Sequence, residues 1–64
     1  MPFQVSMKAA RVNAEKTQAE AAAFIGVSKA TIVNWEAGRR MPKVDQLRKL
    51  CEYYGCPMDN IFLR

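Results

Sequence analysis

The sequence predicts an all-α fold, a single compact domain of five short helices over residues 1–64. Apolar residues recur at helical spacing along most of the chain, and no stretch alternates between apolar and polar as a strand does. Three predicted helices begin after Ser or Thr and three end at Gly, the residue types that favour those positions. A chain of 64 residues builds only a thin core, which excludes a dinucleotide-binding fold or a barrel.

The first predicted helix extends from about Ser6 to Ala14 and follows a short N-terminal arm of residues 1–5. Ser6 is a suitable N-cap, because its hydroxyl can accept a hydrogen bond from a free amide of the first turn. Met7 and Ala10 lie about one helical turn apart and form the apolar side of this segment. We therefore expect this helix to pack against the rest of the core.

The second and third predicted helices are separated only by residues 26–28, and together they occupy about residues 18–37. Thr17 and Glu20 form a capping box at the start of the second helix. A steep crossing over so short a link needs a residue that accepts positive φ, and Gly26 supplies it. The sequence thus predicts two short helices that meet at an angle.

A basic link over residues 39–43 leads to a fourth predicted helix over residues 44–54 and a short fifth helix over residues 58–62. The fourth helix has one apolar stripe, formed by Val44, Leu47, Leu50, Cys51 and Tyr54. None of the five helices is long enough to be stable alone, so they must share a core. We expect this core to contain Met7, Ala10, Ala21, Ala22, Ile25, Val27, Ile32, Trp35, Leu47, Leu50 and Ile61.

The composition argues against an enzyme. The chain has no histidine, which excludes Ser-His-Asp and Cys-His catalytic arrangements and imidazole zinc sites. Cys51 and Cys56 are too few for a zinc site, and we interpret them as reduced thiols, with one disulfide as the alternative. Without a nucleophile–base pair or a phosphate-binding loop, we expect no catalysis, cofactor, metal or small-molecule ligand.

The charge of the chain indicates an anionic partner. Ten Lys and Arg against six Asp and Glu give a net charge of +4, and the sequence pI is about 9.4. Such a surface on a small domain points to nucleic acid or a membrane surface, although many basic surfaces serve only solubility. No apolar run approaches the roughly 20 residues of a membrane span and no signal peptide is evident, so we expect a cytoplasmic protein without membrane association.

The chain reads TQAEAAAFIGVSKATIVNWEAG from Thr17 to Gly38, with Pro42 shortly after. This stretch closely resembles the lambda-repressor-like, Cro/CI-type helix-turn-helix family, also called the XRE family. The segments 47–50, 54–55 and 59–62 are similar to that family's fourth and fifth helices. The resemblance covers nearly the whole chain, and it implies a helix-turn-helix over about residues 18–37.

Three residues depart from the family pattern. Glu15 stands where the family usually has glycine, and we expect it either in a left-handed conformation or in a different turn. Lys16 stands where an aliphatic residue is usual, and its stem can cover apolar surface while its charge stays hydrated. Phe24 occupies a position that is usually polar, so it either folds back onto the surface or contacts another chain. Phe62 and Leu63 also have two interpretations: they either complete the core or support a dimer.

The resemblance implies that helix 29–37 enters the major groove of DNA while the preceding helix crosses the backbone. Lysine and asparagine can hydrogen-bond to purine edges, and methyl groups can contact thymine. The base contacts implied in this way are Lys29, Ala30, Val33 and Asn34. The implied phosphate contacts are Gln18, Ser28, Thr31, Arg39, Arg40 and Lys43. The family also has a partly buried ion pair, which falls here on Arg11 and Glu36.

These observations predict a sequence-specific double-stranded DNA-binding regulator of bacterial or phage origin. We expect it to act as a repressor, as a homodimer on an inverted-repeat operator, and to associate with the nucleoid when bound. The alternative is a protein-interaction module on the same fold, such as an antitoxin-like or bridging factor. The length is what one such domain needs, so we expect a complete small protein, with an excised domain as the alternative.

Overall fold

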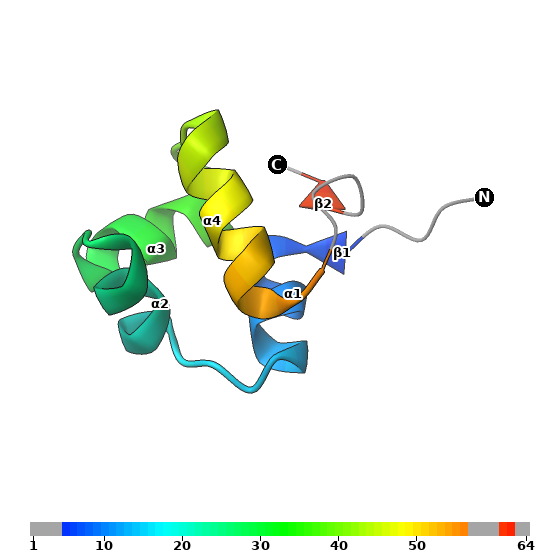
Figure 1. Ribbon diagram of the computed structural model, residues 1–64. Helices are drawn as coiled ribbons and strands as arrows, with labels where there is room; N and C mark the ends of the chain where they lie inside the picture. The colour runs from blue at the N-terminus through cyan, green and yellow to red at the C-terminus, as the bar shows by residue number, and fades with distance from the viewer. Residues whose placement is uncertain (1–4, 57–60, 63–64) are drawn as a thin grey trace.

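The computed structural model describes residues 5–56 and 61–62, and it folds them into four helices and two short strands (Figure 1). The elements in chain order are β1 (Val5–Ser6), α1 (Met7–Asn13), α2 (Gln18–Ile25), α3 (Lys29–Ala37), α4 (Val44–Tyr54) and β2 (Ile61–Phe62). The helices carry the architecture, so the all-α prediction is confirmed for the described part of the chain.

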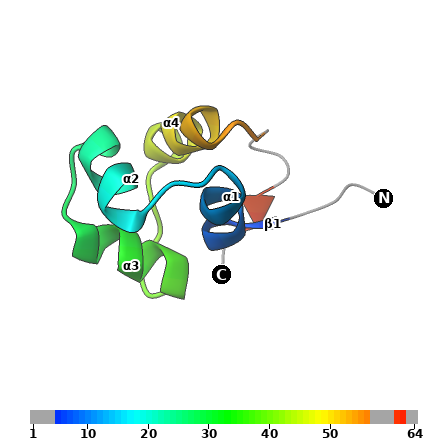
Figure 2. The same cartoon turned by 90° about the horizontal axis from the view of Figure 1, so that it is seen from below.

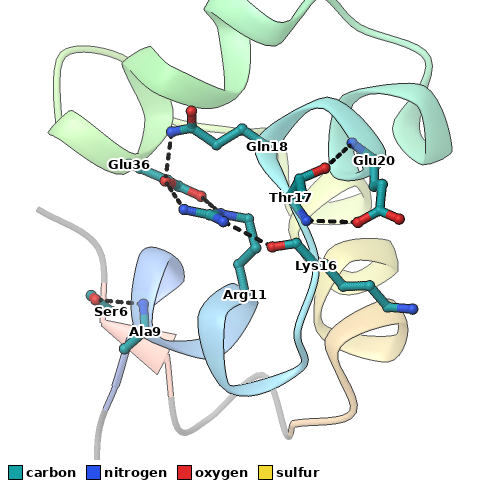
Figure 3. A network of polar contacts seen from close by, with 8 residues as sticks. All are labelled: Ser6, Ala9, Arg11, Lys16, Thr17, Gln18, Glu20 and Glu36. Carbon is teal, nitrogen blue, oxygen red and sulfur yellow. Dashed lines mark hydrogen bonds and ion pairs between the residues drawn. The ribbon is translucent and has the colours of Figure 1, made fainter.

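The predicted helix starts are confirmed at α1 and α2. Ser6 Oγ accepts a hydrogen bond from the amide of Ala9 at 3.1 Å. Thr17 and Glu20 form both bonds of the capping box, one of 3.0 Å from the Glu20 amide to Thr17 Oγ1 and one of 2.8 Å from the Thr17 amide to Glu20 Oε1 (Figure 3). These bonds satisfy amides that a helix leaves without an internal partner.

All four helices end in the same way, with one residue of positive φ that reverses the chain direction. In each case the amide of the next residue donates back to the carbonyl five positions earlier, which is the longer bond of a Schellman motif. The reversing residue is glycine in α2, α3 and α4, but in α1 it is Glu15, with a φ of 59°. Of the two alternatives expected for Glu15, the left-handed conformation is therefore the one found.

The core collects residues from all four helices. It contains Met7, Ala10, Ala21, Ala22, Ile32, Trp35, Leu47, Leu50, Cys51 and Tyr54. Ile25 and Val27, which the sequence assigned to the core, are only partly buried and pack against its edge. The sequence places Val44 on the apolar stripe but not in the core. Val44 is the first residue of α4 and its side chain is 63% exposed, so the buried part of the stripe starts one turn later at Leu47.

The predicted fifth helix is wrong where the structure describes it. Ile61–Phe62 is a strand, β2, and it pairs in parallel with β1, with Val5 opposite Ile61 and Ser6 opposite Phe62. The N-terminal arm offers backbone groups that need partners, and a sequence pattern cannot show that the distant C-terminal segment supplies them. Residues 57–60 lie outside the described part, as do the side chains of Ile61, Phe62 and Leu63.

The helices arrange α3 as an outer element. α3 follows α2 across the short link between them, and it lies at the edge of the molecule opposite α4, with α1 beside it (Figure 2). Ile32 and Trp35 are the buried residues of α3, so its opposite side faces outward. Ile32 and Trp35 therefore attach α3 to the core and leave the opposite side of the helix at the surface.

Candidate nucleic-acid interface

The outward face of α3 carries the four residues predicted to read bases. Lys29 and Ala30 are exposed, and Val33 and Asn34 are partly exposed one turn further along the helix. Residues one turn apart share a side of a helix, so these four form one face opposite the buried residues.

The start of α3 presents two hydroxyl groups beside this face. Ser28 Oγ accepts from the amide of Thr31 at 3.2 Å and lies 3.0 Å from Thr31 Oγ1. Ser28 is the N-cap and is exposed, while Thr31 is partly exposed. A hydroxyl can donate as well as accept, so this pair can donate to an anion at the helix start.

A shallow hollow of about 360 Å³ lies on one side of α3. Asn34 and Thr31 contribute to it from the helix, and Arg40 and Lys43 contribute from the basic link. Gln46 completes the far wall, and its Oε1 accepts from the amide of Lys43 at 2.9 Å, which caps the start of α4. The hollow thus brings three predicted phosphate contacts, Thr31, Arg40 and Lys43, next to the predicted base contact Asn34.

A second hollow of about 230 Å³ lies on the other side of α3 and is lined in part by Val33 and Gln18. Lys8, an exposed residue of α1, also lines it. Lys8 is not among the interface residues expected from the sequence. The sequence feature that indicates this location is the position of Lys8 three residues before Arg11, which places both residues on the same side of α1.

Arg39 lies directly against Asn34. Its Nη1 donates to Asn34 Oδ1 at 3.4 Å, and both side chains are at the surface. The resemblance gave Arg39 a phosphate role only, and the contact with a predicted base reader was missed. Gly38 was the available signal, because a chain reversal after α3 turns the next residue back toward the helix.

Arg11 and Glu36 join α1 to the last turn of α3. Arg11 Nε lies 2.8 Å from Glu36 Oε2, and the side chains are only 11% and 6% exposed (Figure 3). Arg11 Nη1 also donates to the Lys16 carbonyl at 2.8 Å, and Gln18 Nε2 donates to Glu36 Oε1 at 3.1 Å. The hydrogen bond to Glu36 raises the pKa of Arg11 above its ordinary value against the opposing effect of burial. The ion pair expected from the resemblance is therefore present, and it links α1 to α3.

Gln18 keeps a capacity for a second partner. Its amide nitrogen carries two hydrogens, and the bond to Glu36 uses one of them. Gln18 is the first residue of α2 and is partly exposed, beside amides of that helix start. The arrangement can therefore donate to an anion while the bond to Glu36 fixes the side chain.

Phe24 packs on α4 instead of projecting freely. Its ring stacks on Tyr53 with centroids 4.2 Å apart and planes 13° from parallel, and Lys16 Nζ lies 5.0 Å from the centre of the Tyr53 ring. The Phe24 side chain is still 52% exposed. The structure favours the interpretation in which Phe24 folds back onto the surface.

Other kinds of site find little support in the described residues. Among them no three His, Cys, Asp or Glu side chains gather where they could hold a metal ion. No helix that the structure describes is both long and apolar enough to cross a membrane. The predicted interface residues instead lie on α3 or next to it. Cationic side chains lie on its outward face and beside both hollows.

Comparison with known proteins gives two matches. A family model described as helix-turn-helix matches residues 7–61. The transcriptional repressor RstR of the cryptic phage CTXphi from Vibrio cholerae is 36% identical over 56 residues, which cover 88% of this chain and 50% of that protein. The chain spans about half the length of this curated relative.

Proposed function

The chain belongs to the Cro/CI-type (XRE) helix-turn-helix family, and from this premise we propose that it binds double-stranded DNA sequence-specifically and represses transcription. The observation that carries the proposal is the outward face of α3, which offers Lys29, Ala30, Val33 and Asn34 on one side of a capped helix. An α-helix fits the major groove, where each base pair presents a distinct pattern of donors and acceptors.

The chemistry of this face suits base edges. Lys29 can donate to guanine O6 and N7, and the Asn34 amide can hydrogen-bond to a purine. Ala30 and Val33 offer methyl groups for contact with the methyl group of thymine. Each of these side chains is at least partly exposed, so none must leave the core to reach DNA.

Phosphate contacts would position α3 in the groove. Arg40 and Lys43 on one side and Gln18 on the other lie next to the two hollows that flank the helix. The Ser28 and Thr31 hydroxyls lie at its start. Contacts on both sides of a recognition helix fix its orientation on the duplex and provide most of the salt-dependent affinity.

We further propose that the protein acts as a homodimer on an inverted repeat in bacterial or phage DNA, without enzymatic activity. A two-fold dimer would present two copies of α3 to half-sites about 34–36 Å apart. Such a dimer reads about twice as many base pairs as one domain, which raises selectivity.

Selection of binding sites from random double-stranded DNA tests the function directly. We expect an enriched inverted-repeat sequence, with affinity that falls log-linearly with salt by a slope of about −0.9 for each phosphate contact. Arg48→Gln serves as a charge control, because Arg48 is exposed on α4 and forms part of neither hollow. Absence of any enriched sequence, with a protein captured instead in a salt-independent complex, would favour the protein-interaction alternative.

A further inference from the structure

The four helix ends place four pairs of residues side by side. In each Schellman motif the residue after the reversing residue packs against the one five positions earlier, and that contact is usually apolar. At α2 the pair is Ala22 and Val27, and at α4 it is Cys51 and Cys56, with amide-to-carbonyl bonds of 3.0 Å in both. The first member of each of these pairs is buried and the second packs against the core.

The pair at the end of α3 differs from the others. The Arg39 amide donates to the Asn34 carbonyl at 3.0 Å, as in the other motifs, but both side chains are polar and neither is buried. The matching pair of α1, Arg11 and Lys16, is tied into the buried network around Glu36. Among the described helix ends, α3 alone therefore presents this contact at the surface, on the face proposed for DNA.

The 3.4 Å contact between Arg39 Nη1 and Asn34 Oδ1 favours one orientation of the Asn34 amide. An arginine side chain has five N–H donors and no acceptor, so only the oxygen of an asparagine amide can face it. The bond from Arg39 Nη1 to Asn34 Oδ1 follows this rule. The Asn34 nitrogen, with its two hydrogens, is then directed away from Arg39, and a cationic donor occupies one lone pair of the oxygen.

We propose that Arg39 is a positioning residue that sets which base Asn34 reads, an inference that rests on the proposed DNA-binding function. An asparagine that reads adenine must accept from N6 and donate to N7 at the same time. With Arg39 on one lone pair of its oxygen, Asn34 keeps a single acceptor site, whereas its two amide hydrogens and the remaining guanidinium hydrogens are all donors. The pair therefore favours a base with two acceptors on its major-groove edge, which is guanine through O6 and N7.

This inference changes the expected effect of Arg39 on binding. A residue that contacts only phosphate weakens all sequences alike, whereas a residue that orients a base reader changes selectivity at one base pair. Arg40, the next residue, lines the hollow and has no side-chain bond to Asn34 in the described part of the chain. Arg40 therefore provides the matched control for a phosphate role.

The test is site selection from random duplex DNA with the full chain, followed by affinity measurements on each single-base variant of the selected site. Asn34→Ala identifies the base pair that Asn34 reads. We expect guanine there in the wild-type site, preferred at least about fivefold over adenine. Arg39→Met should reduce the preference for guanine, or reverse it in favour of adenine, at that base pair alone. Arg39→Lys keeps a charged donor and should retain part of the preference for guanine.

Two further variants separate positioning from simple affinity. Arg40→Met should weaken all sequences by one factor, and Arg39→Met combined with Asn34→Ala should match the selectivity of Asn34→Ala alone. A uniform loss of affinity in Arg39→Met, or adenine at the Asn34 base pair in the wild-type site, would overturn the inference while the DNA-binding function stands. Failure of the wild-type chain to select any sequence would overturn the proposed function and this inference with it.

Discussion

Gln18 Nε2 donates to Glu36 Oε1 at 3.1 Å, so the first residue of α2 is bonded to the last turn of α3. Glu36 also pairs with Arg11 of α1, and one carboxylate thereby joins three helices (Figure 3). The angle between α2 and α3 decides whether α3 can enter a groove while α2 follows the backbone. This carboxylate is therefore expected to matter for stability and for the geometry of the DNA-binding face.

Glu36→Gln should lower the free energy of unfolding by about 3 kcal/mol, because it leaves the charge of Arg11 largely buried without its counter-charge. Urea unfolding at neutral pH measures the change. Glu52→Gln is the matched control, since Glu52 is exposed on α4, and it should change the stability little. Equal small losses in both variants would show that solvent already screens the Arg11 charge.

Glu15→Gly should stabilise the protein. Glu15 reverses the chain after α1 with a φ of 59°, where a residue with a Cβ is strained by roughly 1–2 kcal/mol. Glycine removes the strain but adds freedom to the unfolded chain, so we expect a net gain of about 0.5–1 kcal/mol. The midpoint of urea unfolding should rise for Glu15→Gly and fall slightly for Glu15→Val. A loss of stability in the glycine variant would contradict the assignment of strain to this residue.

The residues predicted well from the sequence are those whose signal is local. The Thr17–Glu20 capping box is as expected, and Glu15 adopts one of the two conformations expected for it, because both features depend on a few neighbouring residues. The β1–β2 pairing joins segments near the two ends of the chain, and a pattern among neighbouring residues cannot predict such a pairing. The pattern of α4 placed Val44 on the apolar stripe, but whether the core reaches the first residue of a helix depends on tertiary packing.

The candidate interface shows the same division. The family motif predicts which residues of α3 contact DNA, because that helix has a recognisable order of buried and exposed positions. Lys8 reaches the interface from α1, and Arg39 reaches Asn34 through the chain reversal after α3. Both contacts depend on how separate segments meet in space, which the spacing of residues within one segment does not reveal.

Stability should decline in alkaline solution through the Cys51 thiol. Burial raises the pKa of Cys51 from 9.0 to about 11, and burial also raises that of Tyr54 from 10.0 to about 12. Between the ordinary and the raised pKa the unfolded chain loses a proton that the folded chain retains, so rising pH favours unfolding. The stabilising contribution of Cys51 is thus complete below about pH 9 and is lost as the pH approaches about 11.

Urea unfolding of the wild type and of Cys51→Ala at a series of pH values measures this effect. The alanine variant has lower stability throughout because it leaves a small cavity. Its stability should nevertheless fall less steeply from about pH 9 to about pH 11, since the contribution of the Cys51 thiol is then absent and that of Tyr54 remains. Parallel curves for the two proteins would show that Cys51 does not titrate differently in the folded and unfolded states.

Lys8→Gln should weaken binding to every DNA sequence by a similar factor. Lys8 lies beside Gln18 and Val33 at the second hollow, where the backbone of a duplex seated on α3 would pass. Loss of one phosphate contact should reduce the magnitude of the salt slope by about 1 and leave base preferences unchanged. Lys49→Gln on α4 is the control with the same change in net charge, and it should keep the wild-type slope. Identical slopes for both variants would place the DNA backbone away from α1 and restrict the interface to α3 and the basic link.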